Sequence, residues 1–230
     1  MTPTIAAPIT APPLPHAPHV RATRDRVLIS DVPWVKYLRL LKAFERKRNV
    51  RLAYDRGELE IMTTSYEHEG DASFLAHLVE VLTEELGKPI SRGGSVTVKR
   101  RKWQKGIEPD RCFWIANAHR LAGVKRLDLR IHPAPDLSIE VDVTNSSLDR
   151  FGIYAKLGIP ELWRLDGDDL LFHTLGPKSR YADAPTSLAF PGVAPADLFA
   201  FVDQARTAGD QNVVTRAFRQ WVRQRFTPAT

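Results

Sequence analysis

The stretch PDLSIEVDV, residues 135–143, alternates apolar and polar residues without a break. Strict alternation predicts a β-strand, because successive side chains of a strand point to opposite faces of its sheet. The apolar residues would then enter the core, while Glu140 and Asp142 would share the other face. Those two acids either face solvent on a half-exposed strand or lie beneath helices, where unpaired carboxylates are costly and need a cation.

Helices are predicted on both sides of this strand in the sequence. The first would begin at Ser30 or Asp31, the second at Ser65 and the third at Ser146 or Ser147, since these residue types cap helices. The spacing of apolar residues gives their extents as residues 30–47, 65–87, 146–158, 195–205 and 211–226.

Further strands complete the predicted sheet. Alternating runs around residues 55–57 and 166–168 indicate hairpins, and two more strands are expected over residues 94–99 and 107–115. This order of elements favours an α/β or α+β fold, in which a central mixed β-sheet is flanked by helices.

Composition sets the domain organisation and the compartment. Residues 1–24 include a segment rich in Pro, Ala and Thr, which predicts a disordered tail without a secretory signal before a single domain over residues 25–230. No run of about 18 apolar residues exists, so we expect no membrane partner. The single cysteine, Cys112, excludes a disulfide framework and a cysteine-based zinc site, and indicates a reducing compartment, most simply the cytoplasm.

A second predicted strand repeats the acidic pattern. In IEPDRCFWI, Glu108 and Asp110 would share one face, with Pro109 between them. Proline has no amide hydrogen for the sheet ladder, so Pro109 marks a strand start, an edge or a bulge. Such positions often direct a functional side chain.

The start of the helix predicted at residue 65 brings further candidates. Glu67 and Asp71 lie four residues apart and would stack on one face. Acids in a first turn also complement the helix dipole, so Glu67 is either a site residue or a structural one. His68 has the same two interpretations, as a ligand or as part of the helix start.

Together these residues predict a metal site made mainly of oxygen ligands. Asp110, Glu140 and Asp142, joined by Glu67 or His68, would suit Mg²⁺ or Mn²⁺. Divalent ions held by carboxylates are typical of phosphodiester hydrolysis. The net charge of +6 permits nucleic acid as a partner without establishing it.

A basic loop directly precedes the second acidic strand. Its aromatic residue could stack on a base, or the loop could simply be solvated. The candidates for nucleic-acid binding in this loop are Arg100, Arg101, Lys102, Trp103 and Lys105. The last predicted helix also carries arginines, but its opposite face is apolar, so packing is its first role.

Two blocks of sequence carry a resemblance to a known family. YDRGELEIM followed by S and EHE, and YAKLGIPELW further on, make the chain similar to the Uma-two-like endonucleases over roughly residues 30–225. The pattern EPD followed by IEVDV also resembles the PD-(D/E)xK nucleases. The resemblance implies a restriction-endonuclease-like core in which Asp110 and Glu140 bind the metal. It also implies that His68, or its neighbour Glu67, matches an acid or histidine position at the start of the first core helix.

The sequence departs from the nuclease motif at one position. The residue two after the glutamate is lysine in the motif and Asp142 here. Many family members carry the lysine on the next helix, four residues before a tyrosine, and counting back from Tyr154 gives Arg150. Arginine can stabilise a charged phosphate but is a poor base, because it stays protonated.

Three functions follow from this departure. Asp142 acts as a third metal ligand in an active Mg²⁺- or Mn²⁺-dependent DNA endonuclease, or the chain keeps the fold as a nucleic-acid-binding module that has lost cleavage. A protein-interaction scaffold is the third alternative. By analogy with restriction enzymes that cut two strands, we also expect a homodimer.

Overall fold

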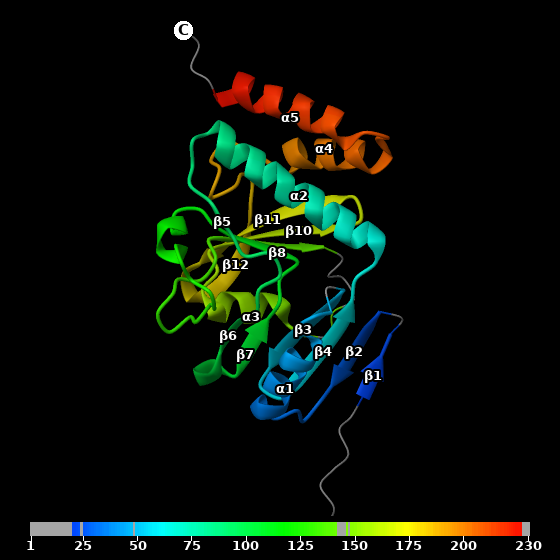
Figure 1. Cartoon of the computed structure of the whole chain (residues 1–230), viewed down its shortest axis with the longest axis vertical. Coiled ribbons are helices and arrows are strands. Elements are labelled where there is room, and N and C mark those ends of the chain that lie inside the picture. Colours follow the sequence, from blue (N-terminus) through cyan, green and yellow to red (C-terminus); the bar gives the residue numbers. More distant parts are fainter. Residues whose placement is uncertain (1–19, 24, 48, 142–145, 147, 227–230) are drawn as a thin grey trace, which may run out of the picture.

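The computed structural model describes residues 20–23, 25–47, 49–141, 146 and 148–226, and its strands form two sheets (Figure 1). Sheet A is antiparallel throughout, in the order β1-β2-β4-β3-β7-β6. Its strands are β1 (Val20–Ala22), β2 (Arg26–Ile29), β3 (Val50–Asp55), β4 (Glu58–Thr63), β6 (Val98–Arg100) and β7 (Lys105–Ile107).

Sheet B is mixed, in the order β12-β11-β10-β9-β8-β5. Its central strands β9 and β10 are parallel, and its other pairs are antiparallel. Its strands are β5 (Ser91–Arg92), β8 (Arg111–Trp114), β9 (Leu137–Val141), β10 (Glu161–Asp166), β11 (Asp169–Gly176) and β12 (Arg180–Ala184). The predicted α+β class, with a mixed sheet flanked by helices, is confirmed, although the strands divide between two sheets.

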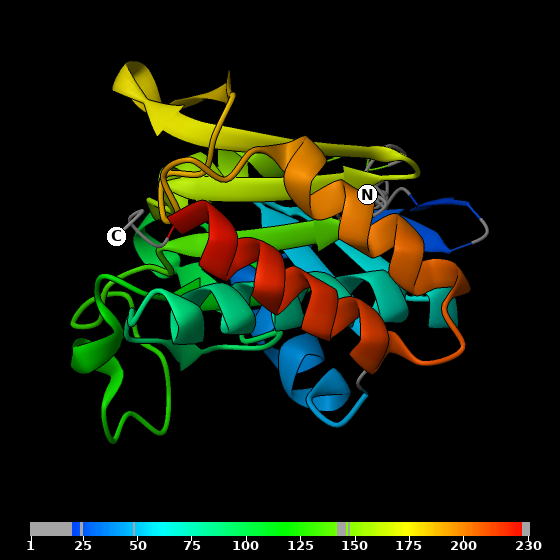
Figure 2. The same cartoon turned by 90° about the horizontal axis from the view of Figure 1, so that it is seen from above.

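The helices lie on both sides of sheet B. Helices α2, α4 and α5 cover one face, and α4 and α5 lie side by side there (Figures 1 and 2). Helix α3 packs on the other face, between sheet B and sheet A, and α1 packs on sheet A. Their bounds are α1 (Trp34–Phe44), α2 (Tyr66–Glu85), α3 (Arg150–Leu157), α4 (Pro195–Thr207) and α5 (Gln211–Phe226), with short 3₁₀ helices at Arg101–Trp103, Ala118–Leu121 and Pro177–Ser179. No helix among the described residues is long and apolar enough to span a bilayer.

The helix starts were predicted with mixed success. Ser65 caps α2 as expected, because its side chain accepts a hydrogen bond from the His68 amide at 3.1 Å. The prediction for α1 was wrong, since the helix follows Pro33 without a side-chain cap. Helix α3 is capped by Asp149, which accepts from the Gly152 amide at 2.8 Å. Ser146 therefore does not cap it, and the alternative at residue 147 lies outside the described residues.

The strand predicted over residues 107–115 is divided between the two sheets. β7 ends at Ile107 in sheet A, and β8 begins at Arg111 in sheet B. Pro109 lies in the connection between β7 and β8. Its missing amide hydrogen therefore costs neither sheet a hydrogen bond. As a result, Asp110 immediately precedes the first residue of β8, where the chain enters sheet B.

The strand β9 is buried on both faces. Ser138 and Glu140 are as buried as the apolar residues that alternate with them. The half-exposed, solvated interpretation of this strand is therefore wrong for Glu140. The predicted tail also reaches the sheet in part, because Val20–Ala22 pairs with β2. Residues 1–19 lie outside the described part of the chain.

Two glycines give opposite predictions for stability. A Cβ atom on Gly106 would lie 2.9 Å from Cζ of Tyr37, whose fully buried ring stacks on Tyr54 with centroids 4.7 Å apart. We expect Gly106→Ala to destabilise the fold by about 1–3 kcal/mol, because this ring cannot move aside cheaply.

Gly70 in α2 has no atom within 4 Å of such a Cβ, so Gly70→Ala should stabilise by about 0.5–1 kcal/mol. Urea unfolding of both variants tests this, and equal stability of Gly106→Ala and wild type would contradict it.

Candidate active site

Two buried carboxylates lie side by side where β8 and β9 meet. The register pairs Arg111 with Ile139, and Asp110 and Glu140 are the next residues beyond this pair, with Asp110 just before the first residue of β8. The carboxylate of Asp110 also accepts a hydrogen bond from the Val141 amide, at 2.9 Å from Oδ2. Asp110 is 0% exposed and Glu140 is 1% exposed. The structure thus brings together the two acids that the sequence singled out, and their role as metal ligands stays a prediction.

Asp110 is surrounded by positive or polarisable groups. His68 Nε2 lies 3.3 Å from Asp110 Oδ2 and 3.1 Å from the Val141 carbonyl oxygen, and Arg51 Nε lies 3.6 Å from Oδ1. Burial by itself would raise the pKa of Asp110, but the contact with His68 and the Val141 amide outweighs it, and the pKa is lowered. Oδ1 is buried and accepts no hydrogen bond from any described residue. Its contact with Arg51 is therefore an ion pair without a hydrogen bond.

Glu140 is held by two residues of α3. Arg150 Nη2 donates to both of its carboxylate oxygens, at 2.8 and 2.6 Å, and the Tyr154 hydroxyl donates to Oε1. Burial raises the pKa of Glu140 to about 7, because desolvation outweighs the attraction of Arg150, and the charge of Asp110 adds to the rise. This carboxylate is consequently near the balance between its charged and neutral forms at neutral pH.

Arg150 bridges two buried carboxylates, those of Glu140 and Glu60. Its guanidinium is 5% exposed, and Nη1 donates to Glu60 Oε1 at 3.0 Å. Glu60 also meets Arg26 at 3.3 Å and accepts from the Ser146 hydroxyl at 2.8 Å. Arg150 thus lies in a buried ion-pair network and is already committed to two carboxylates.

The other predicted ligands are not all gathered here. Glu67 is exposed on the first turn of α2, whereas its neighbour His68 is buried beside Asp110. Asp71 pairs instead with Arg206, at 2.8 Å. Asp142 lies outside the described residues. Among the predicted residues, Asp110, Glu140, His68 and Arg150 form one site.

Sequence reasoning missed several members of this site: Arg26, Arg51, Glu60 and Tyr154. The first three belong to sheet A, which the sequence did not separate from sheet B. Glu60 alternates with apolar residues in GELEIM, but alternation cannot tell a buried acid from an exposed one.

A pocket of about 200 Å³ opens next to Glu140. It lies between the start of α3 and the strands β9 and β10. Its charged and polar lining is Glu140, Ser146, Asp149, Arg150, Tyr154 and Arg164. Glu140 thus borders this pocket, whereas Asp110 is not part of its lining.

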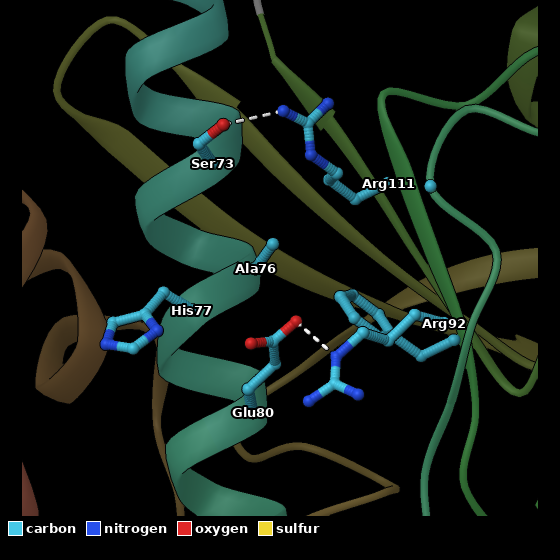
Figure 3. Close-up of a pocket in the computed structure, with 8 residues that line it drawn as sticks. Ser73, Ala76, His77, Glu80, Arg92 and Arg111 are labelled. Carbon is cyan, nitrogen blue, oxygen red and sulfur yellow. Dashed lines mark hydrogen bonds and ion pairs between the residues drawn. The ribbon is translucent and has the colours of Figure 1, made fainter.

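A second pocket, of about 290 Å³, lies on the other face of β8 against α2 (Figure 3). Arg111 donates to the Ser73 hydroxyl at 2.7 Å, and Arg92 pairs with Glu80 at 2.5 Å across it. Arg111 also meets Glu69, which in turn pairs with Arg51 at 2.7 Å. Both arginines of this pocket are paired with carboxylates, as Arg150 and Arg164 are in the pocket beside Glu140.

The basic loop is partly committed to internal contacts. Lys105 pairs with Asp55 at 2.6 Å, and Arg100 donates to the Leu129 carbonyl at 2.6 Å and lies over the ring of Trp103. Lys156 approaches the same ring, and its centroid is 5.7 Å away. Arg101 and Lys102 are exposed. Of the predicted nucleic-acid-binding residues, only these last two present free charge to solvent.

The carboxylate pair consists of hard oxygen ligands of the kind that Mg²⁺ binds, and Arg150 and Tyr154 already donate to the oxygens of Glu140. Asp110 has one buried oxygen that accepts no hydrogen bond from the described residues, and its charge acts on Glu140. In the described part of the chain, no group of three or more His, Cys, Asp and Glu side chains is placed to hold a metal ion. Mg²⁺ commonly binds through one or two carboxylates and completes its shell with water and substrate oxygens, so two acids suffice.

The chain is similar to a known protein family. The model of the Uma2 family, described as "Putative restriction endonuclease", matches residues 34–201 and confirms the resemblance seen in the sequence. A crystal structure described as "a putative nuclease belonging to DUF820", from Anabaena variabilis, is 16% identical, with a TM-score of 0.47. The match covers 66% of this chain and 90% of that chain. A search of the curated proteins found no match.

Proposed function

The chain belongs to the Uma2 family of restriction-endonuclease-like proteins, and from this premise we propose that it is a Mg²⁺- or Mn²⁺-dependent endonuclease that hydrolyses DNA phosphodiester bonds. One observation carries the proposal. Asp110 and Glu140 are two buried carboxylates at the neighbouring ends of β8 and β9, and Glu140 lines a pocket. Two adjacent buried acids repel each other, and a bound cation would offset that cost.

Asp110 and Glu140 would hold the ion. When bound, such an ion polarises a phosphoryl oxygen and lowers the pKa of the attacking water. The protein's own residues keep the two acids in place, since His68 and the Val141 amide orient Asp110, and Arg150 and Tyr154 orient Glu140. Arg150 stays protonated and therefore orients and neutralises charge, without removing a proton.

DNA is the proposed substrate because of charge. The net charge of +6 favours a polyanion, and Arg101 and Lys102 are exposed in the loop that leads through β7 toward Asp110. Contacts of this kind supply affinity without sequence preference.

Cleavage of a supercoiled plasmid tests the proposal. We expect purified wild-type protein to nick the plasmid with Mn²⁺ or Mg²⁺, and to leave it intact in EDTA. Cleavage that persists in EDTA would contradict a metal-dependent mechanism. Loss of cleavage in Asp110→Asn, purified in the same way, would show that the activity belongs to this chain and not to a contaminant.

One observation favours a second function, a nucleic-acid-binding module that does not cleave. Both oxygens of Glu140 are already engaged by Arg150, whose positive charge compensates the acid in the way a metal ion would. If the plasmid stays intact under all metal conditions while DNA is bound with a strongly salt-dependent affinity, this second function replaces the first.

A further inference from the structure

A third charged residue continues the row formed by Asp110 and Glu140. In the parallel pair of β9 and β10, Arg164 is directly in register with Glu140. Neighbouring strands lie about 4.8 Å apart, so Glu140 on β9 and Arg164 on β10 lie at one level, next to Asp110 just before β8. The neighbours of Arg164 in β10, Trp163 and Leu165, point into the core beneath α2, so Arg164 points to the α3 side, as Glu140 does.

The side chain of Arg164 lines the pocket beside Glu140. It is 24% exposed, and its Nη2 atom pairs with Asp166 at 2.6 Å. Its Nε atom is buried and has no hydrogen-bond acceptor among the described residues. The guanidinium of this pocket-lining arginine thus has one buried donor that no described residue satisfies, which is unfavourable.

We propose that Arg164 binds a phosphate oxygen of the DNA strand in this pocket. The inference rests on the proposed function and names a substrate contact that the metal-binding acids do not provide. A guanidinium matches the geometry of phosphate oxygens and stays charged at any working pH. Arg150 cannot easily take this role, because Glu140 and Glu60 already occupy its two terminal nitrogens.

The competing explanation is a structural pair on the strand. Arg164 and Asp166 lie two residues apart on β10 and could serve only to satisfy each other at its partly exposed end. The two explanations differ for Asp166→Asn. If Arg164 binds phosphate, loss of the Asp166 charge should raise DNA affinity, because a carboxylate no longer neutralises the guanidinium. If the pair is purely structural, Asp166→Asn should leave DNA affinity unchanged and destabilise the fold.

The test is binding of a fluorescein-labelled DNA duplex, followed by anisotropy in EDTA so that no cleavage occurs. We expect Arg164→Gln to weaken binding about tenfold and to lower the magnitude of the salt slope by about 1, because one phosphate contact is lost. Arg164→Lys should recover part of the affinity. The matched control is Arg216→Gln on α5, on the far side of sheet B, which removes the same charge and should change affinity less than about twofold (Figure 1).

Equal binding by Arg164→Gln and wild type, with both folded by thermal melting, would overturn the inference. So would an equal loss in Arg216→Gln, because the effect would then be one of net charge. The proposed endonuclease activity is judged separately, by plasmid cleavage. If the wild type does not cleave but Arg164→Gln still loses affinity and salt slope, the phosphate contact stands and the hydrolase falls. If the wild type cleaves and Arg164→Gln binds normally, the phosphate contact falls alone.

Discussion

Replacement of either buried acid, by Asp110→Asn or Glu140→Gln, is expected to reduce metal-dependent plasmid cleavage at least about 1000-fold. Each variant removes one of the two charges that would hold the ion, and a loss of this size corresponds to about 4 kcal/mol of transition-state stabilisation. The amides have the shape of the carboxylates, so the change is one of charge more than of packing. The double variant should be little worse than either single one, because the two acids act as a unit.

The matched control for this experiment is Glu67→Gln. Glu67 was also a predicted ligand but is exposed, so its loss should leave cleavage within about twofold of wild type. The amount of Mn²⁺ bound, measured by calorimetry, should fall in the variants of Asp110 and Glu140 and not in Glu67→Gln. Cleavage that survives in both Asp110→Asn and Glu140→Gln would show that these acids are not the metal ligands.

Arg150→Met is expected to destabilise the fold by about 3–5 kcal/mol. Methionine fills similar space but leaves the buried carboxylate of Glu140 without its bidentate partner, and an uncompensated buried charge is costly. Urea unfolding in EDTA, followed by fluorescence of the five tryptophans, measures the change in the free energy of unfolding. A second variant, Arg150→Met with Glu140→Leu, removes both charges of the Arg150–Glu140 pair and leaves Glu60 paired with Arg26. It should recover most of the loss. Equal instability of the single and double variants would show that packing, and not charge, is responsible.

The loss in Arg150→Met should also depend on pH. Burial raises the pKa of Glu140 from its ordinary 4.5 to about 7, so between these values the folded chain holds a proton that the unfolded chain releases. Glu140 therefore does not lower the free energy of unfolding below pH 4.5, and it lowers that free energy by the full amount above pH 7. Without Arg150 the pKa rises further, so the destabilisation relative to wild type should be larger at pH 8 than at pH 5. A loss that is the same at both values would contradict the charge argument.

Local sequence patterns predicted a helix start or a turn correctly where a single residue of a suitable type stands at that position. Ser65 begins α2 as expected, and Gly57 takes a positive φ of 105° in the hairpin between β3 and β4. The start of α3 could not be predicted from residue type. Ser146, Ser147 and Asp149 are all good N-cap residues, and the sequence does not distinguish among them. The segment around Pro109 was predicted as one strand, although it contributes to both sheets. Proline marks an interruption of a strand but does not show which sheet the chain enters afterwards.

The sequence by itself determined the acidic pair. Alternation in PDLSIEVDV and the EPD pattern selected Glu140 and Asp110, and the family resemblance gave them a common role. These signals are local, because side-chain direction in a strand follows from its period of two.

Only the tertiary structure decided what surrounds that pair. Arg150 meets Glu60 across 90 residues of sequence, and Arg51 reaches Asp110 from the other sheet. Arg164 comes into line with Glu140 only because β9 and β10 are parallel neighbours. The physical reason is that a buried charge must be compensated by whichever group the packing of the two sheets brings within reach, and that depends on strand order and not on local sequence.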